Sequence, residues 1–62
     1  MNNFKPYFET SMKENKGAMF YVEGQIISGV VTKVNKDNVE LRNREYGKII
    51  ILIEKISAIA MS

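Results

Sequence analysis

The spacing of apolar residues is helical only in the first part of the chain. Residues 6–15, PYFETSMKEN, carry Phe8 and Met12 four positions apart, which puts them on one face of a helix. Pro6 suits a first helical position, and Gly17 lies just past the expected end. A helix this short is marginal alone, so the pattern predicts a helix that docks on the rest of the chain.

After residue 17 the apolar residues follow the spacing of β-strands. The stretch AMFYV is rich in aromatic and β-branched residues, and VELRN alternates between apolar and polar. Glu23-Gly24 and two polar segments, 35–38 and 44–47, read as turns. The predicted strands are 18–22, 25–34, 39–43, 49–53 and 57–61, with a break near Glu54-Lys55.

Gly29 lies in the middle of the longest predicted strand. An interior glycine weakens a strand and usually marks a bend or a close approach of backbones. One helix followed by short antiparallel strands, one of them strongly bent, is typical of a small SH3-like or OB-like barrel. The sequence therefore predicts a single, mainly β domain over residues 1–62 with one N-terminal helix.

Ile49 to Ile53 form an uninterrupted apolar run. A strand with one face in water should alternate, so this run indicates that both faces are covered. If this strand or the last one pairs with an edge strand of a neighbouring copy, the copies form a head-to-tail ring and the exposed edges disappear. The alternative is a monomer with an aggregation-prone edge.

Composition narrows the ways in which this chain can be stabilised. A chain of 62 residues buries little surface, and the absence of Cys and His removes disulfides and the usual zinc ligands. Oligomerisation is the remaining route. We expect no cofactor, and the lack of a Gly-rich phosphate loop and of Cys or His argues against an enzyme.

Charge and hydropathy bear on location and partners. The net charge of +2 permits nucleic-acid binding but fits an ordinary solvated surface equally well. No apolar run reaches the roughly 18 residues of a membrane span, and the N-terminal residues lack the apolar core of a signal peptide. The prediction is a cytoplasmic protein with no membrane partner.

Three motifs occur in a recognisable order. Pro6-Tyr7-Phe8 opens the helix, FYVEGQIISGVV places Gly24 and Gly29 five residues apart, and ISAI occupies 56–59. Together they resemble the Sm-like (LSm) family, and within it the bacterial RNA chaperones of the Hfq type. The resemblance covers nearly the whole chain. It implies a strongly bent five-stranded antiparallel barrel, a homo-oligomer that is a six-membered ring, and a role in post-transcriptional regulation.

The resemblance also implies which residues contact single-stranded RNA. On the face that takes A-rich RNA, Phe20 corresponds to an aromatic that stacks on adenines, Ser28 to a polar Gln, and Gln25 to an apolar residue. The alternative is that Phe20 belongs to the core, because Phe20 and Tyr21 point to opposite faces and only one can be buried.

The pore face, which takes U-rich RNA in the family, departs most from the family pattern. The family's Tyr-Lys-His signature falls on Leu52, Ile53 and Glu54, and its stacking Phe falls on Asp37. Carboxylates repeated around one pore would repel phosphate, so we expect U-rich RNA to bind poorly. The remaining positions of this face are Phe4, which could stack, and Asn35, which could read a base edge.

The rim of the ring is an Arg-rich patch in the family. Here the corresponding positions are Met12, Lys13 and Lys16, with acidic residues among them. Because Lys lacks the planar fork of Arg, RNA annealing should be weaker. A solvated helix face is the alternative.

Two main functions follow from these observations. The first is an Hfq-like RNA chaperone that binds A-rich rather than U-rich single-stranded RNA as a ring. The second is an Sm-fold ring or scaffold that has lost RNA binding and acts through protein partners, including mixed rings with another Hfq chain. A monomeric SH3-like module that binds a peptide is a third, which the run Ile49 to Ile53 disfavours. Ring size and RNA targets stay open.

Overall fold

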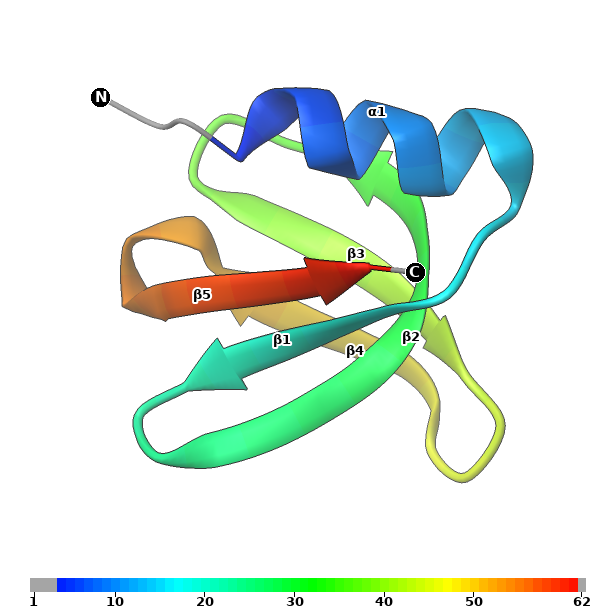
Figure 1. Cartoon of the computed structure of the whole chain (residues 1–62). Helices are drawn as coiled ribbons and strands as arrows, with labels where there is room; N and C mark the ends of the chain where they lie inside the picture. Colours follow the sequence, from blue (N-terminus) through cyan, green and yellow to red (C-terminus); the bar gives the residue numbers. More distant parts are fainter. Residues whose placement is uncertain (1–3, 62) are drawn as a thin grey trace.

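A computed structural model describes residues 4–61, and the ends of the predicted domain, residues 1–3 and 62, lie outside this range. One helix precedes five antiparallel strands, which form one sheet in the order β4-β3-β2-β1-β5 (Figure 1). The elements are α1 (Lys5–Glu14), β1 (Ala18–Val22), β2 (Gln25–Val34), β3 (Asn38–Asn43), β4 (Gly47–Leu52) and β5 (Ile56–Met61), with a 3-10 turn, η1 (Ile53–Lys55), before β5. The mainly β fold with one N-terminal helix is therefore confirmed.

The helix α1 ends earlier than its sequence suggests. Asn15 follows it in the left-handed conformation, with φ 54° and ψ 46°, and its N–H donates to the Ser11 carbonyl. Asparagine tolerates this conformation better than most residues, so Asn15 terminates the helix before Gly17. The side chains of α1 that are buried are Phe8 and Ser11, whereas Met12 is 41% exposed, so the expectation that Phe8 and Met12 share the docked face is wrong.

Ser11 connects the helix to the sheet. Its hydroxyl donates to the Lys16 carbonyl at 2.6 Å and accepts a hydrogen bond from the Val31 N–H at 3.0 Å. Ser11 is 1% exposed, so its hydroxyl supplies the hydrogen-bond partner that water would otherwise give to these two backbone groups. The helix is therefore held by a buried polar contact in addition to the packing of Phe8.

Strand β2 changes partner at Gly29. Residues 25–29 pair with β1, and residues from Val30 onward pair with β3. A Cβ atom at Gly29 would lie 2.8 Å from the carbonyl oxygen of Arg42, so only glycine lets β3 approach this closely. Figure 1 shows that β2 curves strongly along its length, as its central glycine predicts.

The core lies between α1 and the concave side of the sheet. Its buried members are Phe8, Ala18, Phe20, Val31, Val39, Leu41, Ile51 and Ile56. The Ile-rich strand β4 contributes only part of its side chains: Ile51 is 4% exposed, whereas Ile50 and Leu52 are 59% and 48% exposed. One copy of the chain thus covers only one face of β4.

Candidate functional site

An outward-facing apolar surface lies on β1 and β2. Met19 pairs with Ser28, and Tyr21 pairs with Ile26. Because directly paired residues share one face of a sheet, these four side chains lie together on the side away from the core. Met19 and Ile26 are 43% and 59% exposed, and Tyr21 is half-buried. We call Met19, Tyr21, Ile26 and Ser28 the outer face.

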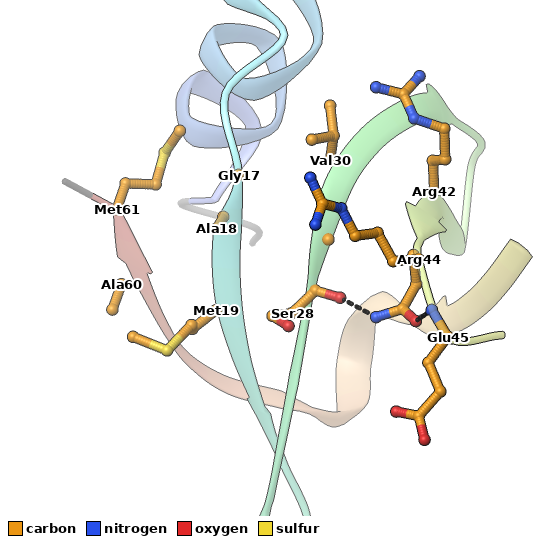
Figure 2. Close-up of a pocket in the computed structure, with 12 residues that line it drawn as sticks. Gly17, Ala18, Met19, Ser28, Val30, Arg42, Arg44, Glu45, Ala60 and Met61 are labelled. Carbon is orange, nitrogen blue, oxygen red and sulfur yellow. Dashed lines mark hydrogen bonds between the residues drawn. The ribbon is translucent and has the colours of Figure 1, made fainter. Parts of the chain in front are cut away.

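An open groove adjoins the outer face (Figure 2). It is open to solvent, has a volume of about 1020 Å³, and runs from the end of β5 across β1 and β2 to the hairpin that joins β3 and β4. Its lining residues are Gly17, Ala18, Met19, Ser28, Gly29, Val30, Arg42, Asn43, Arg44, Glu45, Ala60 and Met61.

Two guanidinium groups make one side of the groove basic. The Nη2 of Arg42 donates to the Asn15 side-chain oxygen at 2.9 Å, and this contact holds Arg42 at the end of α1. The guanidinium of Arg44 extends toward Ser28 and Val30, whereas the carboxylate of Glu45 points away from it (Figure 2). Within residues 4–61, neither arginine forms an ion pair.

The hairpin that carries Arg44 is fixed by Asn43. Its Nδ2 donates to the Ser28 carbonyl at 2.7 Å, and its Oδ1 accepts from the N–H groups of Glu45 and Tyr46 at 2.7 and 3.0 Å. These three bonds tie the turn to β2. Asn43 therefore positions the basic side of the groove, and its amide is engaged within the protein.

The residues predicted for the A-rich face do not come together. Phe20 is 1% exposed and its ring lies 6.2 Å from that of Phe8, so its expected position on a base-stacking surface is wrong. Gln25 is exposed but pairs with Val22, which packs against the core, so it does not share the outer face. Ser28 alone lines the groove.

The residues predicted for the pore face are partly adjacent. The Ile53 N–H donates to the Asp37 carbonyl at 3.0 Å, which brings η1 to the turn between β2 and β3. Glu54 lies exposed in the same η1 turn. Phe4 is at the start of α1, half-buried, with its ring 6.4 Å from Phe8.

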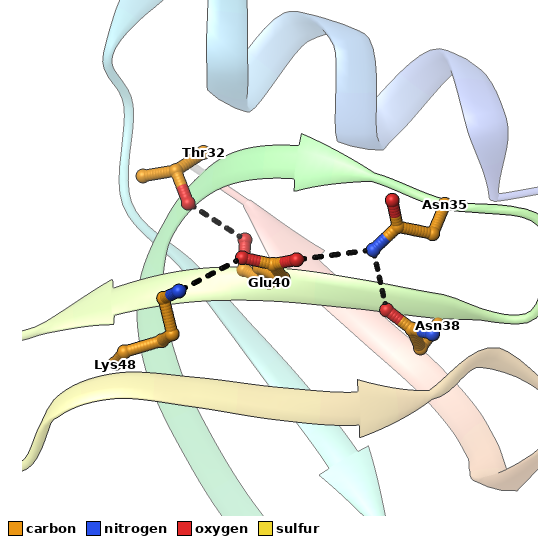
Figure 3. Close-up of polar contacts among 5 residues, drawn as sticks. All are labelled: Thr32, Asn35, Asn38, Glu40 and Lys48. Atoms are coloured by element: carbon orange, nitrogen blue, oxygen red, sulfur yellow. Dashed lines mark hydrogen bonds and ion pairs between the residues drawn. The ribbon is translucent and has the colours of Figure 1, made fainter.

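Asn35 takes part in a polar network rather than presenting its amide to a ligand (Figure 3). Its Nδ2 donates to Asn38 Oδ1 at 2.6 Å and to Glu40 Oε2 at 3.1 Å. An amide nitrogen has two N–H groups, so both donors are engaged within the protein, and the reading of a base edge by Asn35 stays a prediction. The bond from Asn35 and the ion pair with Lys48 at 3.3 Å lower the pKa of Glu40 below its ordinary value of 4.5.

The predicted rim residues occupy the end of the helix. Met12 and Lys13 are exposed on α1, and Lys16 follows the helix, half-buried. The Lys16 backbone is bonded to Ser11 through both its N–H and its carbonyl. The predicted rim therefore lies at the C-terminal end of α1.

The sequence reasoning missed Arg42 and Arg44. Val39 and Leu41 are core residues of β3, so Arg42 falls on the opposite face by simple alternation. The signal for Arg42 was therefore present in VELRN, whereas Arg44 lies in the turn after this strand, where alternation gives no side.

Comparison with protein-family models and with curated proteins found no match to this chain. Across residues 4–61, no helix is long and apolar enough to cross a membrane. The same residues contain no cluster of three or more His, Cys, Asp or Glu side chains that could hold a metal ion.

Proposed function

We propose that this protein is an Sm-like RNA-binding oligomer that holds single-stranded RNA on its outer face. The observation that carries the proposal is the continuity of an exposed apolar surface with a groove that has two arginines on one side, neither of them in an ion pair within residues 4–61. Single-stranded RNA needs both features, because its bases stack on apolar or aromatic side chains and its phosphates follow basic ones.

The outer face and the arginines of the adjoining groove have different roles in this proposal. Tyr21 offers a ring on which a base stacks, with Ile26 beside it. Arg42 and Arg44 contact the backbone, and the planar guanidinium forks match phosphate oxygens better than ammonium groups do. Ser28 adds a hydroxyl next to the arginines. We keep the preference for A-rich over U-rich RNA, because the acidic Asp37 and Glu54 occupy the positions that a U-rich site would need.

The two edges of the sheet support the proposed ring. Strands β4 and β5 each have a neighbour on only one side among the described strands. Pairing β4 of one copy with β5 of the next would satisfy both edges and cover Ile50 and Leu52. The resemblance to Hfq implies a ring of six copies. We propose that this ring acts as an RNA chaperone in the cytoplasm.

Fluorescence anisotropy with short oligo-A and oligo-U at several salt concentrations tests this function. We expect oligo-A to bind with an affinity that falls as salt rises, since phosphate contacts release counterions. Replacing Tyr21 with Ala should weaken binding by about 1–3 kcal/mol per stacked base. Tyr7→Ala is the matched control, because Tyr7 is 53% exposed on α1, away from the outer face.

Two results would contradict the proposal. One is binding that Tyr21→Ala and Tyr7→Ala weaken equally, and the other is the absence of binding at low salt. Tight binding of oligo-U at physiological salt would overturn the base preference alone.

A scaffold without RNA binding is the second candidate. It is favoured by the burial of Phe20 and by the engagement of the Asn35 amide with Asn38 and Glu40. Such a protein would assemble into the same oligomer and leave both oligonucleotides unbound.

A further inference from the structure

The segment that ends α1 contacts the basic side of the groove through one side chain. Asn15 follows the helix, and its Oδ1 accepts a hydrogen bond from Nη2 of Arg42 at 2.9 Å. The two residues are 27 positions apart in the sequence, so this contact joins the end of the helix to β3. Within residues 4–61 it is the only hydrogen bond that the Arg42 guanidinium forms. The orientation of this guanidinium therefore depends on Asn15.

Backbone contacts hold Asn15 in place. Its left-handed conformation, with φ 54°, directs its N–H to the Ser11 carbonyl, and the Lys16 N–H is bonded to the same carbonyl at 2.9 Å. The Ser11 hydroxyl donates to the Lys16 carbonyl and accepts from the Val31 N–H, so the segment after α1 is tied to β2. The backbone that carries the Asn15 amide is therefore fixed against the sheet.

An arginine that is oriented in advance binds a phosphate more tightly than a mobile one. Arg42 is exposed, and an exposed arginine samples many rotamers unless a contact selects one. Ordering a long side chain at the moment of binding costs free energy, and a contact that orders it beforehand removes part of this cost. A guanidinium has several N–H groups, and Asn15 engages one of them, so the others remain available to phosphate oxygens.

We propose that Asn15 is a positioning residue for the RNA site, because its hydrogen bond orients the Arg42 guanidinium before RNA binds. The inference rests on the proposed function, which assigns Arg42 to an RNA phosphate. It goes beyond that function by making the end of α1 part of the RNA site, although Asn15 does not line the groove. The effect is specific to Arg42, since Asn15 has no contact with Arg44.

Replacing Asn15 with Gly removes the amide and keeps the end of the helix. Glycine favours the left-handed conformation of this position, so the melting temperature should change little. We expect short oligo-A to bind about threefold to tenfold more weakly in fluorescence anisotropy at low salt, because Arg42 must then be ordered on binding. Thr10→Ala is the control, since the Thr10 hydroxyl bonds to the Pro6 carbonyl of the same helix, and it should leave binding unchanged.

A double-mutant cycle separates positioning from a general effect on the fold. In an Arg42→Ala background, Asn15→Gly should have no further effect on oligo-A binding, because the side chain that it orients is gone. In an Arg44→Ala background, the same substitution should still weaken binding by the full factor. The proposal is overturned if Asn15→Gly has equal effects in the two backgrounds, or if Asn15→Gly alone leaves the affinity unchanged.

NMR relaxation of the Arg42 side-chain Nε–H group tests the positioning without RNA. We expect its order parameter to fall in Asn15→Gly and to stay unchanged in Thr10→Ala. Oligo-A binding together with equal order in the unmodified protein and in Asn15→Gly would keep the RNA function and overturn the role of Asn15. Absence of oligo-A binding would overturn the RNA function, and the order parameter would then still decide whether Asn15 orients Arg42.

Discussion

At the scale of single residues, Ser11 is a small side chain whose removal should lower the free energy of unfolding markedly. Its hydroxyl bonds to Val31 N–H and to the Lys16 carbonyl while almost fully buried. Ser11→Ala leaves both groups without a partner, so we expect the free energy of unfolding to fall by about 1–3 kcal/mol. Urea denaturation followed by circular dichroism measures this change.

A neighbouring hydroxyl provides the control for Ser11. Thr10 Oγ1 donates to the Pro6 carbonyl at 3.0 Å, but this bond is exposed to solvent. Thr10→Ala should change stability by less than about 0.5 kcal/mol. Equal effects of the two substitutions would contradict the role of Ser11 as the polar link between α1 and β2.

Individual contacts are also where the sequence was least informative. Strand alternation in AMFYV divides Phe20 from Tyr21, but it does not say which of them faces the core. The answer depends on Phe8, which packs on Phe20 from a helix separated from β1 by a short loop. Likewise, nothing in the local sequence reveals that the Asn35 amide is used by Glu40, because that bond depends on how the β2–β3 turn folds back.

At the scale of elements, the sequence predicted most of the fold. The bounds of β1 and β2 agree with the predicted ranges, β3 and β5 each begin one residue earlier than predicted, and α1 and β4 differ by one or two residues at both ends. The turn between β1 and β2 explains why their bounds were predicted correctly. Glu23 and Gly24 both have positive φ, 50° and 82°, as a two-residue hairpin turn of this kind requires. The end of α1 was missed because Asn15 takes a conformation usually assigned to glycine.

Gly29 provides the sharpest test of how β2 and β3 fit together. A methyl group at this position meets the backbone of Arg42, which cannot move without shifting β3. We expect Gly29→Ala to lower the free energy of unfolding by about 1–3 kcal/mol, as overpacking typically does. Gly17→Ala is the control, because no atom lies within 4 Å of the added methyl. Thermal melting compares the two variants, and an equal loss in both would contradict a specific clash with Arg42, because backbone entropy by itself makes Gly→Ala stabilising.

At the scale of the whole molecule, the sheet has two edge strands, and within residues 4–61 neither β4 nor β5 is paired on its outer side. The apolar run Ile49 to Ile53 suggested coverage on both faces, and the structure assigns Ile51 to the core while leaving Ile50 and Leu52 exposed. The burial of one face of β4 within a single chain could be predicted from the apolar periodicity. Coverage of its other face could not, since it depends on a second copy of the chain.

The exposed side of β4 therefore decides whether this chain works alone. If β4 pairs with β5 of the next copy, Ile50→Lys places a charge in the new interface and should shift the protein toward the 7.1 kDa monomer in analytical ultracentrifugation. Ile26→Lys is the matched control, because Ile26 and Ile50 are both 59% exposed, but Ile26 lies on β2 in the middle of the sheet. We expect the control to keep the mass of the unmodified protein. A monomeric unmodified chain would remove the ring, whereas an oligomer that Ile26→Lys disrupts and Ile50→Lys does not would move the interface to the outer face and leave no open surface there for RNA.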